Sequence, residues 1–116
     1  MNMPEIKKRL ADFAAARDWD QFHSPKNLSM GLAAEAAELL EIFQWLTEEQ
    51  SRGILTDEKE MRHVREEIAD VFIYLVRLAD KLNVDIEKAV LEKIGINELR
   101  YPIEQSKGNA TKFNRR

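Results

Sequence analysis

Apolar residues recur at steps of three and four along most of this chain, which is the pattern of amphipathic α-helices. No alternating run bounded by turn residues indicates a β-strand. Four helices are expected, over residues 4–17, 25–46, 57–82 and from 86 to a point before Pro102, with a short helix ending at Gly53 between the second and the third. The pattern therefore predicts an all-α fold of the four-helix-bundle type.

Capping residues set the expected starts of these helices. The expected N-caps are Ser24, Thr47, Thr56 and Asp85. Pro25 suits the first helical position after Ser24, and Gln50 completes a capping box with Thr47.

The second and third helices carry the longest apolar stripes. These stripes are Leu32, Ala36, Leu39, Phe43 and Leu46 in the second helix, and Met61, Val64, Ile68, Val71, Leu75, Leu78 and Leu82 in the third. Such stripes pack against another helix and by themselves indicate only a core. Leu40, Ile73 and Val76 lie off the stripes, so we expect them to be buried between copies of the chain.

Length and composition narrow the class of protein. The 116 residues suit one domain over 1–102, followed by a polar, basic tail over 103–116. No cysteine is present, which excludes disulfide and thiol chemistry and is compatible with a cytoplasmic protein. No signal peptide or membrane span is expected. The net charge of −3 argues against a nucleic-acid-coating surface but allows a phosphate substrate bound through a cation.

Two carboxylate pairs flank the apolar stripes. One ridge consists of Glu35, Glu38, Ile42 and Trp45 on the second helix, and the other of His63, Glu67, Asp70 and Tyr74 on the third. Members of a pair are one turn apart and can reach a common point, and antiparallel packing would make the two pairs face each other. Four close carboxylates repel unless cations lie between them, and hard oxygen ligands suit Mg²⁺ or Mn²⁺.

Other interpretations of these pairs stay open at this point. A carboxylate pair at this spacing is common on solvated helix faces, and the chain has 21 acidic residues. A di-iron bundle would need Glu-x-x-His on two helices, whereas Glu38 and Asp70 stand where those histidines would be.

The sequence around the pairs is more specific than the pairs themselves. The segments FAAARDWDQFHSPKNL, EAAELLEIFQW, EEIADVFIYLVRLADKLNVDIEKAV and RYPIEQSKGNATKF resemble the MazG-like all-α NTP pyrophosphohydrolases, in particular their dCTP pyrophosphatase branch. The resemblance covers about residues 6–113 and includes the ExxE…ExxD signature of that family.

The resemblance implies roles for individual residues. It implies Mg²⁺ ligands at Glu35, Glu38, Glu67 and Asp70; aromatic pocket residues at Trp19, Trp45 and Tyr74; and phosphate and pocket-wall residues at Lys93, Asn97, Arg100 and Tyr101. The expected reaction cleaves a nucleoside triphosphate to a monophosphate and pyrophosphate, in a homotetramer built as a dimer of dimers. Glu38, or else Glu35, is expected to orient or deprotonate the attacking water.

Competing functions remain at this level. A related hydrolase of dUTP or of a phosphoribosyl nucleotide would share the signature, and a non-catalytic helical interaction module would use the acidic ridges only for solvation. Spacing alone favours Trp45 as a core residue, because aromatic side chains mostly fill cores. The resemblance instead assigns Trp45 to stacking on the base.

Overall fold

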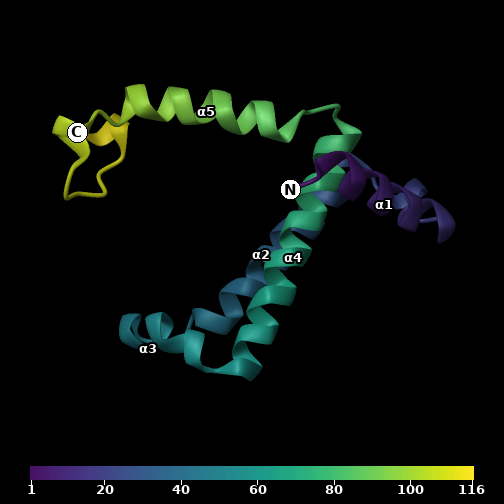
Figure 1. Ribbon diagram of the computed structural model, residues 1–116, viewed down its shortest axis with the longest axis horizontal. Coiled ribbons are helices and arrows are strands. Elements are labelled where there is room, and N and C mark those ends of the chain that lie inside the picture. Colours follow the sequence, from purple (N-terminus) through teal and green to yellow (C-terminus); the bar gives the residue numbers. More distant parts are fainter. The chain divides into compact units, whose positions relative to one another are not determined.

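The computed structural model describes residues 1–116 and contains only helices, which confirms the predicted all-α class (Figure 1). The α-helices are α1 (Met3–Ala16), α2 (Pro25–Phe43), α3 (Glu48–Arg52), α4 (Glu58–Lys81), α5 (Ile86–Arg100) and α6 (Ile103–Ser106). Short 3-10 helices occupy Asp20–Phe22, Gly53–Thr56 and Phe113–Arg115. The chain divides into two compact units, Met1–Asn83 and Val84–Arg116, which are described separately below.

Several predicted helix ends differ from those in the structure. The sequence predicts four helices and one short helix, whereas the structure has six α-helices, α6 being the addition. α4 begins after Asp57 rather than Thr56, because the Asp57 carboxylate accepts the Glu60 amide at 3.1 Å. α2 ends at Phe43 rather than near residue 46, because Thr47 is extended as the N-cap of α3 and the chain must leave the helical path before it.

The other predicted caps are present. The Ser24 hydroxyl accepts the Asn27 amide at 3.1 Å, with Pro25 as the first residue of α2. Thr47 and Gln50 form the predicted capping box, with distances of 3.0 and 3.1 Å. Local sequence therefore determines where α2 and α3 begin.

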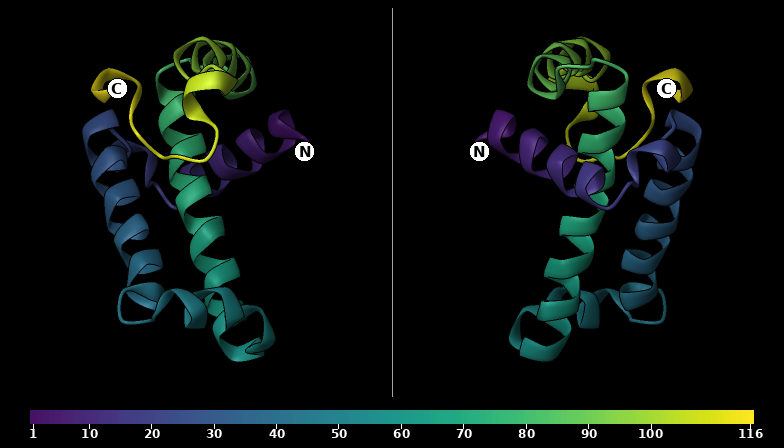
Figure 2. Two further views of the ribbon diagram at one scale, coloured as in Figure 1. Left: turned by 90° about the vertical axis from the view of Figure 1, so that its left-hand side faces the viewer. Right: turned by 90° about the vertical axis from the view of Figure 1, so that its right-hand side faces the viewer.

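The antiparallel pair of α2 and α4 forms the main contact of the first unit (Figure 2). α1 also packs on α4. α2 and α4 approach closely at Gly31, where a Cβ atom would overlap the Tyr74 ring. Glycine at this position therefore lets the aromatic ring lie directly against the α2 backbone.

The buried core of the first unit is small. Its buried apolar residues are Ala14, Leu28, Val64, Val76 and Ala79. The interface position predicted for Val76 is wrong, since this side chain is 1% exposed within the unit. Part of the predicted α4 stripe is outside the core, because Ile68, Leu75 and Leu82 are 53%, 38% and 52% exposed. The stripe is therefore buried at Val64, whereas near the end of α4 the buried residues are Val76, Arg77 and Ala79, which lie off the stripe.

A buried arginine connects α4 to the segment between α1 and α2. Arg77 is 5% exposed, and its Nη2 donates to Asp20 Oδ1 at 3.0 Å. His23 Nδ1 lies 3.3 Å from Arg77 Nε, Asp80 lies 3.6 Å from Nη1, and Lys81 donates to Asp20 at 2.6 Å. We call these five residues the Arg77 cluster.

The second unit consists of α5, α6 and the C-terminal segment. The residues of the predicted basic tail form α6 and a 3-10 helix. Phe113 packs edge-to-face on Tyr101 with ring centroids 5.9 Å apart, and the Arg100 guanidinium lies 4.6 Å from the Phe113 ring centroid. Arg116 donates to the Arg100 carbonyl. The tail is therefore packed against the end of α5 rather than extended. In neither unit is there a helix whose length and apolar character would let it cross a membrane.

The Gly31–Tyr74 contact generates a stability prediction. Gly31→Ala is expected to lower the free energy of unfolding by about 1–3 kcal/mol, because the new methyl group overlaps the ring. The matched control is Gly95→Ala in α5, where nothing lies within 4 Å and where alanine should stabilise the helix by about 1 kcal/mol. Urea unfolding of both variants measures the difference. Equal stabilisation by the two alanines would contradict the close packing.

Candidate metal centre

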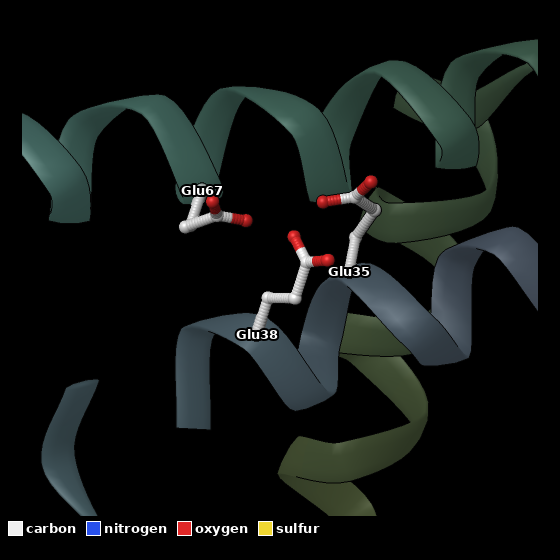
Figure 3. A group of neighbouring side chains, drawn as sticks. All are labelled: Glu35, Glu38 and Glu67. Carbon is white, nitrogen blue, oxygen red and sulfur yellow. The ribbon is translucent and has the colours of Figure 1, made fainter. Parts of the chain in front are cut away.

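Three carboxylates from two helices converge between α2 and α4. Glu35 and Glu38 come from α2 and Glu67 from α4, and their side chains point toward one another (Figure 3). One oxygen from each lies within 4.8 Å of the other two. The three-residue spacing places Glu35 and Glu38 on one face of α2, and the antiparallel pairing brings that face to Glu67.

Two of these carboxylates have an oxygen that is buried without a hydrogen-bond partner. These atoms are Oε2 of Glu35 and Oε2 of Glu67. Buried polar atoms in proteins are normally satisfied, since an unmade hydrogen bond costs about 1–3 kcal/mol. Each unsatisfied oxygen therefore calls for a ligand or a proton.

The electrostatics of the cluster favour a proton when no cation is bound. Burial is the largest cause that raises the pKa of Glu35 from 4.5 to about 7, and the nearby Glu38 carboxylate is the next. Burial also raises the pKa of Glu67, as does the charge of Glu38. The pKa of a carboxyl rises in this way when the charged form loses water and gains like-charged neighbours.

Asp70 lies on α4 one turn beyond Glu67 and is half-buried. Its charge contributes to the raised pKa values of Glu35 and Glu67. It stands outside the group of three whose oxygens meet within 4.8 Å. The structure thus brings three of the four predicted ligands into one cluster and places the fourth beside it.

The donor set fits a hard divalent cation. Carboxylate oxygens alone form the cluster, with no cysteine in the chain. Mg²⁺ and Mn²⁺ prefer such oxygens, and a cation would both satisfy the two buried oxygens and offset the repulsion.

A cleft of about 380 Å³ opens beside the cluster. Its lining residues are Glu38, Glu41, Ile42, Glu60, His63 and Glu67. Glu41, Glu60 and His63 are not among the site residues predicted from the sequence. Glu41 is three residues after Glu38 and His63 is four before Glu67, so helical spacing offered a signal for these two.

The predicted aromatic pocket residues occupy different parts of the first unit. Tyr74 packs on Gly31 of α2. Trp19 is 47% exposed and lies edge-to-face with Phe13, ring centroids 5.8 Å apart. Trp45 is 86% exposed and follows the end of α2, so it lies beyond the helical ridge on which the sequence predicts it. This exposure also excludes Trp45 from the core of the unit.

The remaining predicted substrate residues belong to the second unit. Lys93, Asn97 and Arg100 lie on α5, and Tyr101 is its C-cap. Within this unit the Tyr101 and Arg100 side chains are engaged by Phe113.

The chain is similar in sequence and in fold to proteins that are named as pyrophosphatases. Residues 32–115 match the MazG-like family. The chain is 42% identical over 111 residues to dCTP pyrophosphatase 1 of Rattus norvegicus and 41% identical over 111 residues to that of Homo sapiens, which covers 96% of this chain. It spans 65% of the length of these relatives. The crystal structure of a pyrophosphatase from Archaeoglobus fulgidus DSM 4304 matches with a TM-score of 0.81 and 41% identity, over 88% of this chain and 94% of that one.

The raised pKa of Glu35 makes a pH dependence testable. Between pH 4.5 and about 7 the folded chain binds more protons than the unfolded chain, so this residue's contribution to stability falls as pH rises through that window. Glu35→Gln should remove this contribution in metal-free buffer.

Mg²⁺ should raise the melting temperature of the wild type most at pH values above about 7, where the carboxylates are ionised. Thermal melts across this range, with and without Mg²⁺, test both effects; identical curves for wild type and variant would contradict them.

Proposed function

We propose that this chain, which belongs to the MazG-like family, is a magnesium-dependent pyrophosphohydrolase of nucleoside triphosphates. The observation that carries the proposal is the carboxylate cluster of Glu35, Glu38 and Glu67 with its two unsatisfied buried oxygens. The relatives named dCTP pyrophosphatase 1 suggest dCTP among the best substrates. The products would be a nucleoside monophosphate and pyrophosphate, consistent with removing triphosphates from a cytoplasmic nucleotide pool.

The side chains of the cluster would divide the chemistry between them. A bound divalent cation supplies charge neutralisation for the phosphates and Lewis acidity toward water. Glu35 and Glu67, with buried oxygens, would hold the cation, and Asp70 would complete the set. Glu38 is exposed and lines the cleft, so it is placed to orient the attacking water or to accept its proton. The chain has no cysteine, so a thiol nucleophile is excluded.

Lys93 and Arg100 would neutralise the departing pyrophosphate. Both carry the positive charge that a phosphate requires, and both lie on α5 within the second unit. Their assignment to this role comes from the family resemblance of the segment that contains them.

A complete site would need more than one copy of the chain. Trp19 precedes α2 and Trp45 follows it, and the 19-residue helix between them is about 28 Å long. The Arg77 and Asn27 contacts hold the Trp19 segment at the N-terminal end of α2. Two rings so far apart cannot flank one base in a single chain. We therefore propose that one copy supplies Trp19 and another Trp45 to a shared pocket.

Exposed apolar residues support this assembly. Ile68 and Leu75 of α4 and its C-cap Leu82 recur every seven residues and are exposed. A seven-residue apolar repeat is the pattern by which helices of two subunits pack. The expected assembly is a homotetramer built as a dimer of dimers, with Leu40 and Ile73, 58% and 37% exposed, also at its interfaces.

The first functional prediction concerns the carboxylates. Glu38→Gln is expected to abolish dCTP hydrolysis while preserving the fold, because the amide keeps the shape but loses the charge. Glu66→Gln is the matched control, since Glu66 is exposed on α4 next to Glu67. Product analysis by ion-exchange chromatography should give dCMP and pyrophosphate for the wild type and the control.

Three outcomes of that experiment would count against the proposal. Wild-type turnover by Glu38→Gln at limiting Mg²⁺ would remove Glu38 from the metal and water site. A nucleoside diphosphate as the main early product would make the reaction a different one. No Mg²⁺-dependent hydrolysis of dCTP, dUTP or other triphosphates by the wild type would favour a helical interaction module instead.

The second functional prediction concerns the shared pocket. Trp19→Ala and Trp45→Ala should each raise KM more than they lower kcat, because stacking persists in ground and transition states. Co-expression of the two variants should restore wild-type KM in a fraction of the sites, since a mixed pair assembles one pocket with both tryptophans intact. Trp45→Ala should leave the helical content unchanged, because Trp45 is 86% exposed in the single chain and fills no core position. Absence of restoration in co-purified hybrids would place both rings in the same chain's site.

A further inference from the structure

The segment that carries Trp19 is held by backbone contacts on its upstream side. Asp18 adopts a φ of 55°, in the left-handed region that few non-glycine residues occupy. The amide of Trp19 donates to the Ala14 carbonyl at 2.9 Å, and that of Asp18 donates to Ala15 at 3.1 Å. The end of α1 therefore fixes where the Trp19 backbone begins.

The downstream side of the segment depends on side chains. Asn27 Nδ2 donates to the Phe22 carbonyl at 2.9 Å. Between Trp19 and Phe22, the contacts that reach across to another long helix are those of Asp20 with Arg77 and Lys81. Asp20 is the residue directly after Trp19, so its position sets the direction in which the chain leaves the tryptophan.

The Arg77 guanidinium is the buried member of this cluster. It lies between Asp20, Asp80 and His23, and its side chain is 5% exposed, while that of Asp20 is 58% exposed. A buried cation that loses its partners is strongly destabilising, which ties the segment firmly to α4. Burial and the charge of Arg77 lower the pKa of His23, so its ring is neutral near pH 7 and its Nδ1 can accept from the guanidinium.

The contacts of Arg77 join residues far apart in sequence. Asp20 and His23 are 57 and 54 positions away from it. α4 also carries Glu67, ten residues before Arg77, so one rigid helix spans both the carboxylate cluster and the anchor of the Trp19 segment. We propose that Arg77 is a positioning residue: through Asp20 and His23 it holds the Trp19 ring in a fixed place relative to the carboxylates of α4.

The inference concerns the position of Trp19 and rests on the proposed function only for its kinetic consequence. Its primary test is therefore spectroscopic. The chain has two tryptophans, so Trp45→Phe leaves Trp19 as the sole indole. In this background we expect Arg77→Met to shift the Trp19 emission to longer wavelength, lower its anisotropy and increase acrylamide quenching.

Two further variants make that test specific. Arg65→Met removes an exposed arginine of the same helix, which pairs only with Glu58 at 3.9 Å, and should leave the emission unchanged. Asp20→Asn removes an exposed charge without opening a core position, and it should shift the emission in the same direction as Arg77→Met even if the latter folds poorly. The inference would be overturned if Asp20→Asn and Arg77→Met both kept the emission and anisotropy of the Trp45→Phe chain, whatever their melting temperatures.

Kinetics in the otherwise native chain provide the second readout. Arg77→Met should raise KM for dCTP roughly fivefold or more with little change in kcat. A fivefold loss of affinity corresponds to the lower end of the free energy that stacking on a base contributes to binding. Combined with Trp19→Ala it should add nothing further, because Arg77 acts through that ring. An added KM increase in the double variant would overturn the inference. A different outcome is an emission shift in Arg77→Met while KM stays unchanged in both Trp19→Ala and Arg77→Met. That result would refute the role of Trp19 in the proposed function, but it would support the positioning of Trp19 by Arg77.

Discussion

Like-charge repulsion between α2 and α4 is the constraint on which the first unit depends. Glu35, Glu38 and Glu67 bring three carboxylates within 4.8 Å at the main helix contact of the unit. Such an arrangement opposes the packing that creates it, since each charge raises the free energy of the others. The helix pair therefore needs either protons or a cation at its centre, and it needs attractive contacts elsewhere along its length. The Gly31–Tyr74 approach supplies such a contact between α2 and α4, and the Arg77 cluster ties α4 to the segment that leads into α2.

The small core strengthens the dependence on other interactions. Only five apolar side chains are buried, and several large apolar residues of α4 are exposed. Burial of apolar surface is the dominant favourable term in folding, so the proposed association of copies would add to the stability that so small a core supplies. Assembly would cover the seven-residue repeat on α4 and would bring Trp19 and Trp45 of different copies together. The same apolar surface would then serve both stability and the substrate pocket.

Much of the fold was accessible from sequence because its determinants are local. Capping residues and helical periodicity predict α1, α2, α4 and α5 to within a few residues, and one-turn spacing predicts that Glu35 and Glu38 share a face. The features that could not be predicted from the sequence depend on contacts between residues that are distant along the chain. Val76 is buried although it lies off the apolar stripe of α4, while the stripe residues Ile68 and Leu75 are exposed. Trp45 leaves the α2 ridge because the cap of α3 ends the helix early.

The contrast between two charged regions along α4 argues for a functional centre. Around Arg77 the charges balance: the Arg77 guanidinium and the Lys81 ammonium face Asp20 and Asp80, and each of these groups has a partner. Around Glu35 and Glu67 the charges are all negative, and two buried oxygens have no hydrogen-bond partner. A helix pair shaped only for stability would have no reason to keep the second arrangement beside the first, because apolar residues of similar size would pack there without repulsion. Its retention at the centre of α2 and α4 is accounted for if a cation binds between the helices, which would convert the repulsion into the attraction that completes the unit.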